Sequence, residues 1–412
     1  MLDQFFTQHG PVLRLRAGLL GPYLDAFAAR LSQAGYARST VRTQLWLVAD
    51  LDRWLKRRAF HVTQLCPRVT DAFITRRRRT GGVRRGNAAT LRLLLDHLQA
   101  TGVIPAAPPV VDRSALGQLK RRYEEYLRTD RGLSPWTACR NWFVLRCFLG
   151  ERFGDGPLRL RQLRPDDITH FVLRHCPRRA SAQLQSTALR SFFRFLFQTG
   201  AIDRDLSAAV PAVRRWRLVD VPKYLEPADV DRLLASCDRT SALGRRNYAV
   251  LMLLARLGLR AGEIVRLELG DLDWRRGELT VRGKGAVHDR LPLPREVGEA
   301  VAAYLRTDRP PCATRRVFLR GKAPHRGFNH PSTVSTVVRR ALERAGLTPP
   351  IKGAHLLRHS LATGLLRRGA SLSEIGDLLR HRASTTTEIY AKVDLNSLRA
   401  LAHPWPVSGG GR

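Results

Sequence analysis

Six residues in the C-terminal half of the chain have side chains that could act together on a phosphate group. They are Arg260, Lys284, His355, Arg358, His381 and Tyr390. Arginine and lysine neutralise phosphate oxygens, and histidine can hydrogen-bond to them or transfer a proton. A tyrosine hydroxyl, with an ordinary pKa of about 10, is a poor nucleophile until cations stabilise its phenolate. Taken singly, each residue has a simpler explanation: a packed tyrosine, a solvated helix face or a lysine in a turn.

The segment AHLLRHSLATGLLRRGAS is predicted to be a helix that carries His355. His355 and Arg358 are three residues apart, so on a helix they share one face. Gly369 is typical of a residue that ends such a helix. The sequence therefore predicts that one histidine and one arginine are presented side by side.

Two capping patterns predict that the chain then folds back twice. Ser371 and Glu374 form an S-x-x-E capping box at the start of the next helix, and Thr385 and Glu388 form a second box. We expect this second box to begin the helix that carries Tyr390. Two reversals could return Tyr390 towards the helix before Gly369.

The other two cations lie upstream. Arg260 ends an apolar helical run, YAVLMLLARLGLR, and Glu263 follows it by three residues. Lys284 lies between two glycines in GELTVRGKGAVHDRLPLP, residues 277–294, which indicates two short strands joined by a turn. Helical patterns surround this β-region, so the third part of the chain is expected to be mostly α with a small sheet.

The net charge of +36 predicts a polyanionic partner. Basic residues number 71 against 35 acidic ones, and all but seven of the basic residues are arginine. A GC-rich genome could explain the preference for arginine over lysine, but it does not explain a twofold excess of bases over acids. Nucleic acid is the leading candidate for the partner.

The six cysteines form no C-x-x-C pair, so the sequence predicts neither a zinc ribbon nor a redox dithiol. There is no signal-peptide pattern at the start and no uncharged run of about 18 residues that could span a membrane. We expect no membrane association, no cofactor, no metal site, and a cytoplasmic location.

An internal repeat precedes the third part. QLCPRVTDAF (64–73) matches QLRPDDITHF (162–171), HLQATGVI (97–104) matches FLFQTGAI (195–202), and GYARST (35–40) aligns with GLSPWT (132–137). The offsets are nearly constant, which indicates a duplicated helical domain. Each copy carries an arginine-rich segment, residues 76–86 and 174–183, which we interpret as a contact to the DNA backbone.

Proline-rich breaks at 105–114 and 209–230 complete the predicted organisation. We expect an N-terminal helical DNA-binding domain at 1–107, a second helical domain at 115–212 and a third domain at 220–412 that ends in a tail.

Together these motifs resemble the tyrosine recombinases, also called the phage integrase family. The resemblance rests on G-L-R-x-G-E, G-K-G, H-x-x-R, L-x-H and T-x-x-I-Y in that order. It covers residues 225–400 as the catalytic domain and 115–208 as the family's helical, SAM-like core-binding domain. It implies a multidomain C-shaped clamp around double-stranded DNA.

The resemblance also implies roles for the cations. Arg260 and Arg358 would bind the non-bridging phosphate oxygens and neutralise charge that grows in the transition state. Lys284 would protonate the departing 5′ oxygen as a general acid.

The remaining roles follow in the same way. Tyr390 would attack the phosphate to give a 3′-phosphotyrosine, His355 would assist proton transfer from it, and His381 would hydrogen-bond the phosphate. Such a link conserves the phosphoester, so religation needs neither ATP nor metal.

The family usually has glycine where this chain has Arg380, and this residue could crowd the turn or add a phosphate contact. The segment VDLNSLRALA, residues 393–402, could form a short helix that docks on a neighbouring protomer. As the resemblance implies, four protomers, with or without related recombinases, would exchange strands between two sites in the bacterial nucleoid for integration, excision or transposition.

Two other functions stay open at this point. A type IB topoisomerase uses the same nucleophile and similar cations to relax supercoils. A non-catalytic DNA-binding protein could retain the same scaffold.

Overall fold

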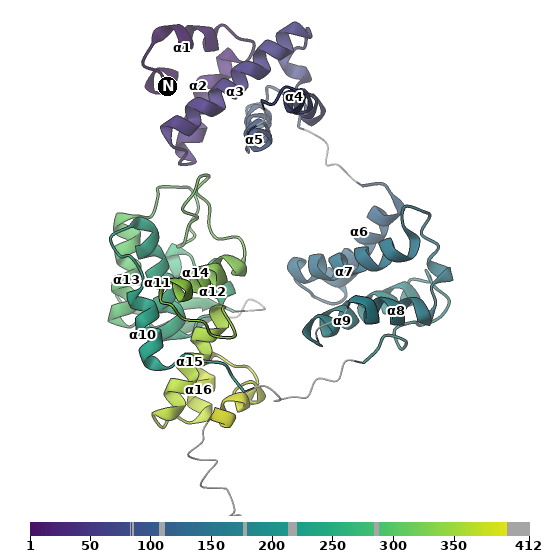
Figure 1. Ribbon diagram of the computed structural model, residues 1–412, viewed down its shortest axis with the longest axis vertical. Coiled ribbons are helices and arrows are strands. Elements are labelled where there is room, and N and C mark those ends of the chain that lie inside the picture. The colour runs from purple at the N-terminus through teal and green to yellow at the C-terminus, as the bar shows by residue number, and fades with distance from the viewer. Residues whose placement is uncertain are drawn as a thin grey trace, which may run out of the picture. The chain divides into compact units, whose positions relative to one another are not determined.

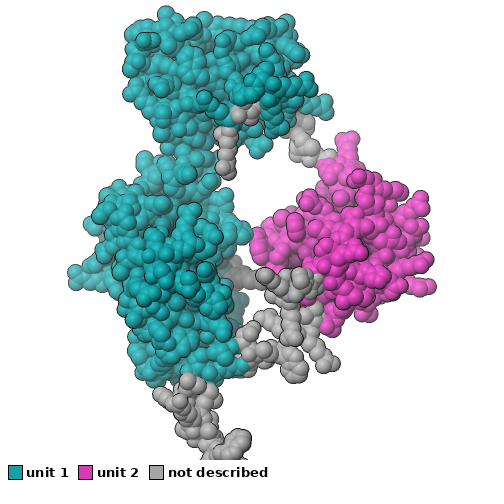
Figure 2. Space-filling view, in the orientation of Figure 1, with its two compact units in different colours: residues 1–106, 218–412 teal, residues 107–217 magenta. Residues whose placement is uncertain are grey.

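Helices make up most of the chain in the computed structural model, which describes residues 1–82, 84, 86–106, 112–175, 179–212, 221–283 and 288–393. The chain divides into two compact units, one formed by residues 1–106 and 218–412 and the other by residues 107–217 (Figure 2). Among the described residues, no helix is long and apolar enough to cross a membrane. The predicted separation of 1–107 from 220–412 as distinct domains stays a prediction.

The N-terminal part is a bundle of helices around one apolar core. Its elements are η1 (Leu2–Gln4), α1 (His9–Arg16), α2 (Gly21–Gln33), α3 (Arg38–Arg57), η2 (Val62–Gln64), α4 (Pro67–Arg79) and α5 (Asn87–Ala100) (Figure 1). Helix α3 shows why the bundle forms: Val41, Leu45, Val48, Leu51 and Leu55 recur at three- and four-residue spacing, and all five are buried.

The second unit is also helical. It contains α6 (Ala115–Thr129), α7 (Pro135–Phe153), η3 (Leu160–Gln162), α8 (Pro165–His175) and α9 (Arg179–Gln198). Ser114 and Ser134 cap α6 and α7, each accepting a hydrogen bond from a backbone N–H of the first turn. Tyr123, Phe148 and Phe192 are among the large buried side chains of its core.

The N-terminal bundle and the second unit contain the same order of helices, and corresponding helices are separated by about the offset of the sequence repeat. A long helix leads to a 3₁₀ turn, and a helix that begins at proline follows: α3, η2 and α4 in the first copy, α7, η3 and α8 in the second. Pro67 begins α4 and Pro165 begins α8, 98 residues later, and a further helix follows in each copy.

The C-terminal part is helical with one small sheet. Its elements are α10 (Pro227–Ala235), α11 (Ala242–Leu257), α12 (Ala261–Arg266), η4 (Leu269–Asp271), β1 (Leu272–Asp273), β2 (Glu278–Arg282), β3 (His288–Pro292), α13 (Arg295–Thr307), α14 (Pro331–Arg344), α15 (Ala354–Arg367), α16 (Leu372–Leu379), η5 (Ser384–Thr386) and η6 (Glu388–Val393). The strands pair antiparallel in the order β1-β2-β3, with Leu279 opposite Leu291. The expectation of a mostly helical fold with a small sheet is confirmed.

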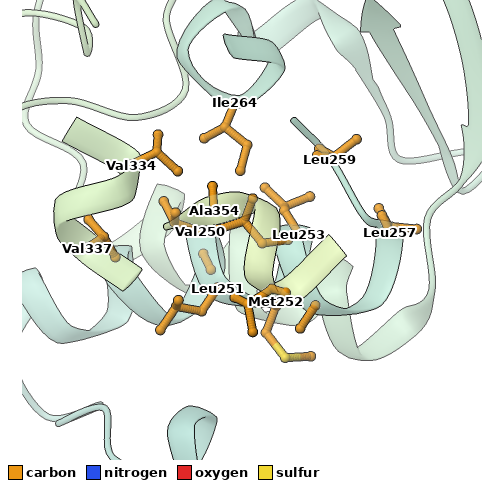
Figure 3. Packing of buried hydrophobic residues seen from close by; sticks show 14 of the residues in the cluster. Val250, Leu251, Met252, Leu253, Leu257, Leu259, Ile264, Val334, Val337 and Ala354 are labelled. Atoms are coloured by element: carbon orange, nitrogen blue, oxygen red, sulfur yellow. The ribbon is translucent and has the colours of Figure 1, made fainter. Parts of the chain in front are cut away.

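Helix α11 forms the centre of this part. Val250, Leu251, Met252 and Leu253 are consecutive and almost completely buried, so this turn of the helix is apolar on all sides. Figure 3 shows these residues among apolar side chains from other elements, including Ile264 of α12. The buried middle of this helix gives a fixed frame for the loop at its end.

Candidate active site

The loop after α11 positions the first predicted cation. Gly258 ends the helix in the left-handed conformation (φ 58°), and a Cβ there would lie 2.7 Å from the Leu379 side chain. Arg260 is the N-cap residue of α12, so it follows the apolar helix and does not end it. The Glu263 carboxylate accepts from the Arg260 backbone N–H at 2.8 Å and from its Nη1 at 2.9 Å. These bonds fix the Arg260 guanidinium at the start of α12.

Helix α15 carries the predicted His-x-x-Arg pair, and it ends before Gly369 as the sequence predicts. Arg358 is only 4 % exposed and donates to the carbonyl oxygens of Gly258 and Leu379. Burial, with the charges of Arg260 and Arg380, lowers the pKa of Arg358 to about 10. This guanidinium ties the ends of α11 and α16 to α15 and remains charged at neutral pH.

Helix α16 begins with the predicted capping box. The Glu374 backbone N–H donates to Ser371 Oγ at 3.2 Å, and the Ser371 N–H donates to the Glu374 carboxylate at 2.8 Å. The helix ends at Leu379, and His381 follows two residues later with its Nδ1 at 2.8 Å from Thr387 Oγ1.

The helix that was predicted to carry Tyr390 is present, but it is a 3₁₀ helix that begins at Glu388. The segment forms two 3₁₀ helices, η5 and η6, and the Tyr390 N–H donates to the carbonyl three residues back, at Thr387. Three consecutive β-branched threonines favour an α-helix poorly. The segment still places the Tyr390 hydroxyl beside His359 of α15.

The Tyr390 ring and its hydroxyl have different surroundings. The residue is 1 % exposed and packs with Ala362, Ile375 and Leu379. Its hydroxyl lies 2.9 Å from Nδ1 of His359. Burial raises the pKa of Tyr390 to about 12, against the opposing influence of Arg358. The ring fills a small core while the hydroxyl contacts a titratable group.

His359 is the site residue that the sequence reasoning missed. It follows Arg358 directly and lies one helical turn after His355, whose ring centroid is 6.4 Å away. Burial, followed by His355 and Arg358, lowers the pKa of His359 to about 4, so the ring is neutral at pH 7. The pattern His-x-x-Arg-His was visible in the sequence and could have indicated this residue.

Five of the six predicted residues lie in the described part of the chain, and the two arginines among them act on the pKa values of their neighbours. Burial, Arg358 and Arg260 all lower the pKa of His355. Burial, followed mainly by the same two arginines, lowers the pKa of His381 to about 4. Electrostatic interactions, direct or through a shared neighbour, therefore connect these five residues: Arg260, His355, Arg358, His381 and Tyr390.

Lys284 lies outside the described residues, so its place in the site stays a prediction. The strands on either side of it are described: β2 and β3 pair up to Arg282 opposite His288. Within the described part of the chain, no group of three or more His, Cys, Asp or Glu side chains is arranged to hold a metal ion.

Arg380 occupies the turn between α16 and His381. Its backbone is left-handed (φ 56°, ψ 51°), a conformation that costs a non-glycine residue about 1–2 kcal/mol. Its side chain is 6 % exposed and its Nη2 lies 2.8 Å from the Glu263 carboxylate. The side chain is therefore buried in an ion pair, in place of the direct phosphate contact that we considered from the sequence.

Known proteins resemble the chain along most of its length. Residues 223–396 match the Phage integrase family. The chain is 44 % identical to y4rA of Sinorhizobium fredii, an integrase/recombinase by name, over 94 % of this chain and 95 % of that protein. It is 33 % identical to the tyrosine recombinase XerD of Mycobacterium tuberculosis, over 68 % of this chain and 96 % of XerD.

Solved structures share the fold. The XerH site-specific recombinase, bound to palindromic difH substrate in a post-cleavage complex, has a TM-score of 0.53 at 17 % identity over 74 % of this chain and 92 % of XerH. A lambda integrase dimer bound to a COC′ core site has a TM-score of 0.51 at 20 % identity over 76 % of this chain and 89 % of the integrase. The sequence relatives carry the stronger conclusion: the chain belongs to the tyrosine recombinases of the phage integrase family.

Proposed function

We propose that this tyrosine recombinase cuts and rejoins double-stranded DNA at specific sites through a covalent bond between Tyr390 and a DNA 3′ phosphate. The observation that carries the proposal is the contact between the Tyr390 hydroxyl and His359, in a site where Arg358 opposes the rise in the tyrosine pKa. A phenol beside a neutral imidazole and guanidinium groups can give up its proton and attack a phosphorus atom.

The roles of the arginines follow from their burial. Arg358 is held by two backbone carbonyls and keeps a fixed position. The Arg260 side chain is 39 % exposed, so its guanidinium can still reach a phosphate. We assign both to the non-bridging oxygens, where their positive charges offset the charge that accumulates in the transition state.

The proton transfers complete the step. The Tyr390 oxygen forms a bond to phosphorus while the bond from phosphorus to the 5′ oxygen breaks. With its own proton on Nε2, His359 can accept the tyrosine proton at Nδ1, and we assign this role to it in place of His355. Lys284 supplies a proton to the 5′ oxygen in this proposal, on the strength of the sequence motif alone. The free 5′ hydroxyl of a second strand then reverses the step.

DNA must open a route to the hydroxyl, because Tyr390 is buried in the chain alone. We further propose that the helical domains and the catalytic domain clamp the duplex and that four protomers pair two sites. The family resemblance and the charge of +36 support this proposal. The named relatives and structures are integrases or recombinases, and none supports the type IB topoisomerase.

The test is covalent capture on nicked suicide duplexes cut from the DNA that flanks the encoding gene. Cleavage next to the nick releases a short fragment, so the adduct cannot religate and survives denaturing electrophoresis. The wild-type chain should form the adduct and Tyr390→Phe should form none. Tyr224→Phe is the matched control, because Tyr224 packs beside the same small core and its hydroxyl accepts from Arg367.

Either of two outcomes would contradict the proposal. An adduct in Tyr390→Phe would place the nucleophile elsewhere. Specific binding to such a duplex by the wild-type chain, without an adduct, would favour the non-catalytic scaffold.

A further inference from the structure

Glu263 is shared by two arginines from different segments. Its Oε1 accepts from Arg260 Nη1 at 2.9 Å, and its Oε2 lies 2.8 Å from Arg380 Nη2. The Glu263 side chain is 2 % exposed. Burial alone would raise the pKa of Glu263, but Arg380 and the contacts from Arg260 outweigh it and hold the carboxyl in its charged form.

Arg380 holds Arg260 from a second side as well. The Arg260 Nη2 donates to the Arg380 backbone carbonyl at 3.2 Å. The left-handed backbone at Arg380 turns the chain after Leu379, and the Arg380 N–H donates to the Asp377 carbonyl. The same residue thus contacts the guanidinium of Arg260 through its own backbone and restrains Glu263 through its side chain.

Arg380 also reaches the sheet. Its Nε lies 3.8 Å from the Asp289 carboxylate on β3, a distance that permits electrostatic attraction but no hydrogen bond. Its Nη1 donates to the Leu378 carbonyl at 3.3 Å. The buried guanidinium therefore connects the end of α16, the start of α12 and the second strand of the β2–β3 pair.

The charges explain why a second arginine matters here. If Glu263 had Arg260 as its single cationic partner, the carboxylate would neutralise the cation that is proposed to bind phosphate. A second buried guanidinium supplies the counter-charge. The cluster of Arg260, Arg380, Glu263 and Asp289 then has no net charge, whereas without Arg380 it would carry one negative charge. Glu263 and Arg380 are almost completely buried, so the charges of this pair are poorly screened by water.

We propose that Arg380 is a positioning residue that fixes the Arg260 guanidinium and leaves its charge available to the scissile phosphate. This inference rests on the proposed function, because it assumes that Arg260 binds that phosphate. The glycine that the family usually has at this position would adopt the left-handed backbone without strain. Glu263 would then keep Arg260 as a partner but lose Arg380.

The test compares two substrates in single-turnover cleavage. One is the ordinary duplex, and the other carries a methylphosphonate at the scissile position, where a methyl group replaces one charged oxygen. A neutral phosphate needs less charge compensation, so a defect in the charge of Arg260 should be smaller on this substrate. A defect caused by misfolding should be equal on both.

Arg380→Gly should cleave the ordinary duplex about 10- to 100-fold more slowly than wild type and the methylphosphonate duplex within about threefold of wild type. Arg380→Lys, which keeps a cation, should recover part of the loss. Arg367→Gln is the matched control, since Arg367 forms an ion pair with Glu226 outside the site. It should cleave both substrates like wild type. Equal losses on both substrates, or no loss in Arg380→Gly, would overturn the proposal.

A binding measurement separates this proposal from the cleavage chemistry. In a Tyr390→Phe background, which needs no covalent step, the chain should bind the ordinary duplex more tightly than the methylphosphonate duplex. Adding Arg380→Gly should reduce that preference about tenfold, and an unchanged preference would overturn the role of Arg380. If the preference falls as expected while the wild-type chain forms no adduct, the proposed strand cleavage fails and the role of Arg380 stands.

Discussion

The hydroxyl of Tyr390 lies 2.9 Å from Nδ1 of His359, and both residues are largely shielded from water. A buried phenol surrounded by hydrocarbon would have no means of losing its proton. Here the phenol faces a neutral imidazole, with Arg358 next to that imidazole in the chain. The relationship supports treating Tyr390 as a reagent, although its ring is also part of a small core.

His359→Ala tests the assignment of the proton acceptor. Single-turnover cleavage should fall about 10²- to 10⁴-fold, the usual contribution of a positioned acid or base, while noncovalent duplex binding stays within about threefold. The comparison variant is His355→Ala in the same assay. If His355→Ala abolishes cleavage and His359→Ala leaves it intact, proton transfer belongs to His355.

Acid should destabilise the chain through His359 and His381. The pKa values of His359 and His381 are about 4 in the folded chain, against about 6.5 when unfolded. Between these values the unfolded chain binds more protons, so the stability that these residues contribute is lost as pH falls from 6.5 towards 4. Melting temperatures at pH 7.5, 6 and 5 should show this fall.

The double variant His359→Gln, His381→Gln should flatten that dependence, and the exposed His170→Gln should not. Equal slopes in the wild-type chain and the double variant would show that other groups control acid unfolding.

Thr387 supports His381 through its hydroxyl, which lies 2.8 Å from Nδ1. Thr387→Val keeps the shape of this buried side chain but leaves the imidazole nitrogen without its partner, which should reduce the free energy of unfolding by about 1–3 kcal/mol. Thr387→Ser keeps the hydroxyl and should cost about 0.8 kcal/mol for the lost methyl group. Urea unfolding and cleavage rates should both rank Ser above Val, and the reverse order would remove Thr387 from the site.

Replacing arginines at the end of α4 tests the prediction that this segment contacts the DNA backbone. Arg78 and Arg79 are exposed, whereas Arg77 pairs with Asp50 at 2.5 Å and donates to the Gly82 carbonyl. If Arg78 and Arg79 each bind a phosphate, replacing both by glutamine should make the plot of log affinity against log salt shallower by about two.

Arg77→Gln is the matched control, and it should lower the melting temperature while leaving that salt dependence unchanged. An unaltered slope in the double variant would exclude these two arginines from the interface.

The sequence predicted much of the local geometry around the site. The capping box at Ser371, the stop at Gly369 and the paired strands around residue 284 are all present, because each depends on short-range backbone preferences. The helix that carries Tyr390 is present as a 3₁₀ helix, and its type was not predicted, since a capping pattern predicts that a helix starts but not which type of helix follows.

The contacts of His359 and Arg380 could not be predicted from the sequence. The partner of His359 lies 31 residues away and that of Arg380 lies 117 residues away, so the tertiary fold decides both contacts. Arg380 stood out as a departure from the family pattern, but the sequence did not indicate that its side chain is buried against Glu263.

The most direct measurement maps the covalent adduct itself. After capture on a suicide duplex, nuclease and trypsin digestion should leave a nucleotide joined through its 3′ phosphate to the peptide ASTTTEIYAK, residues 383–392, and fragmentation should place it on Tyr390. A nucleotide on any other residue, or a link through the 5′ phosphate, would contradict the account.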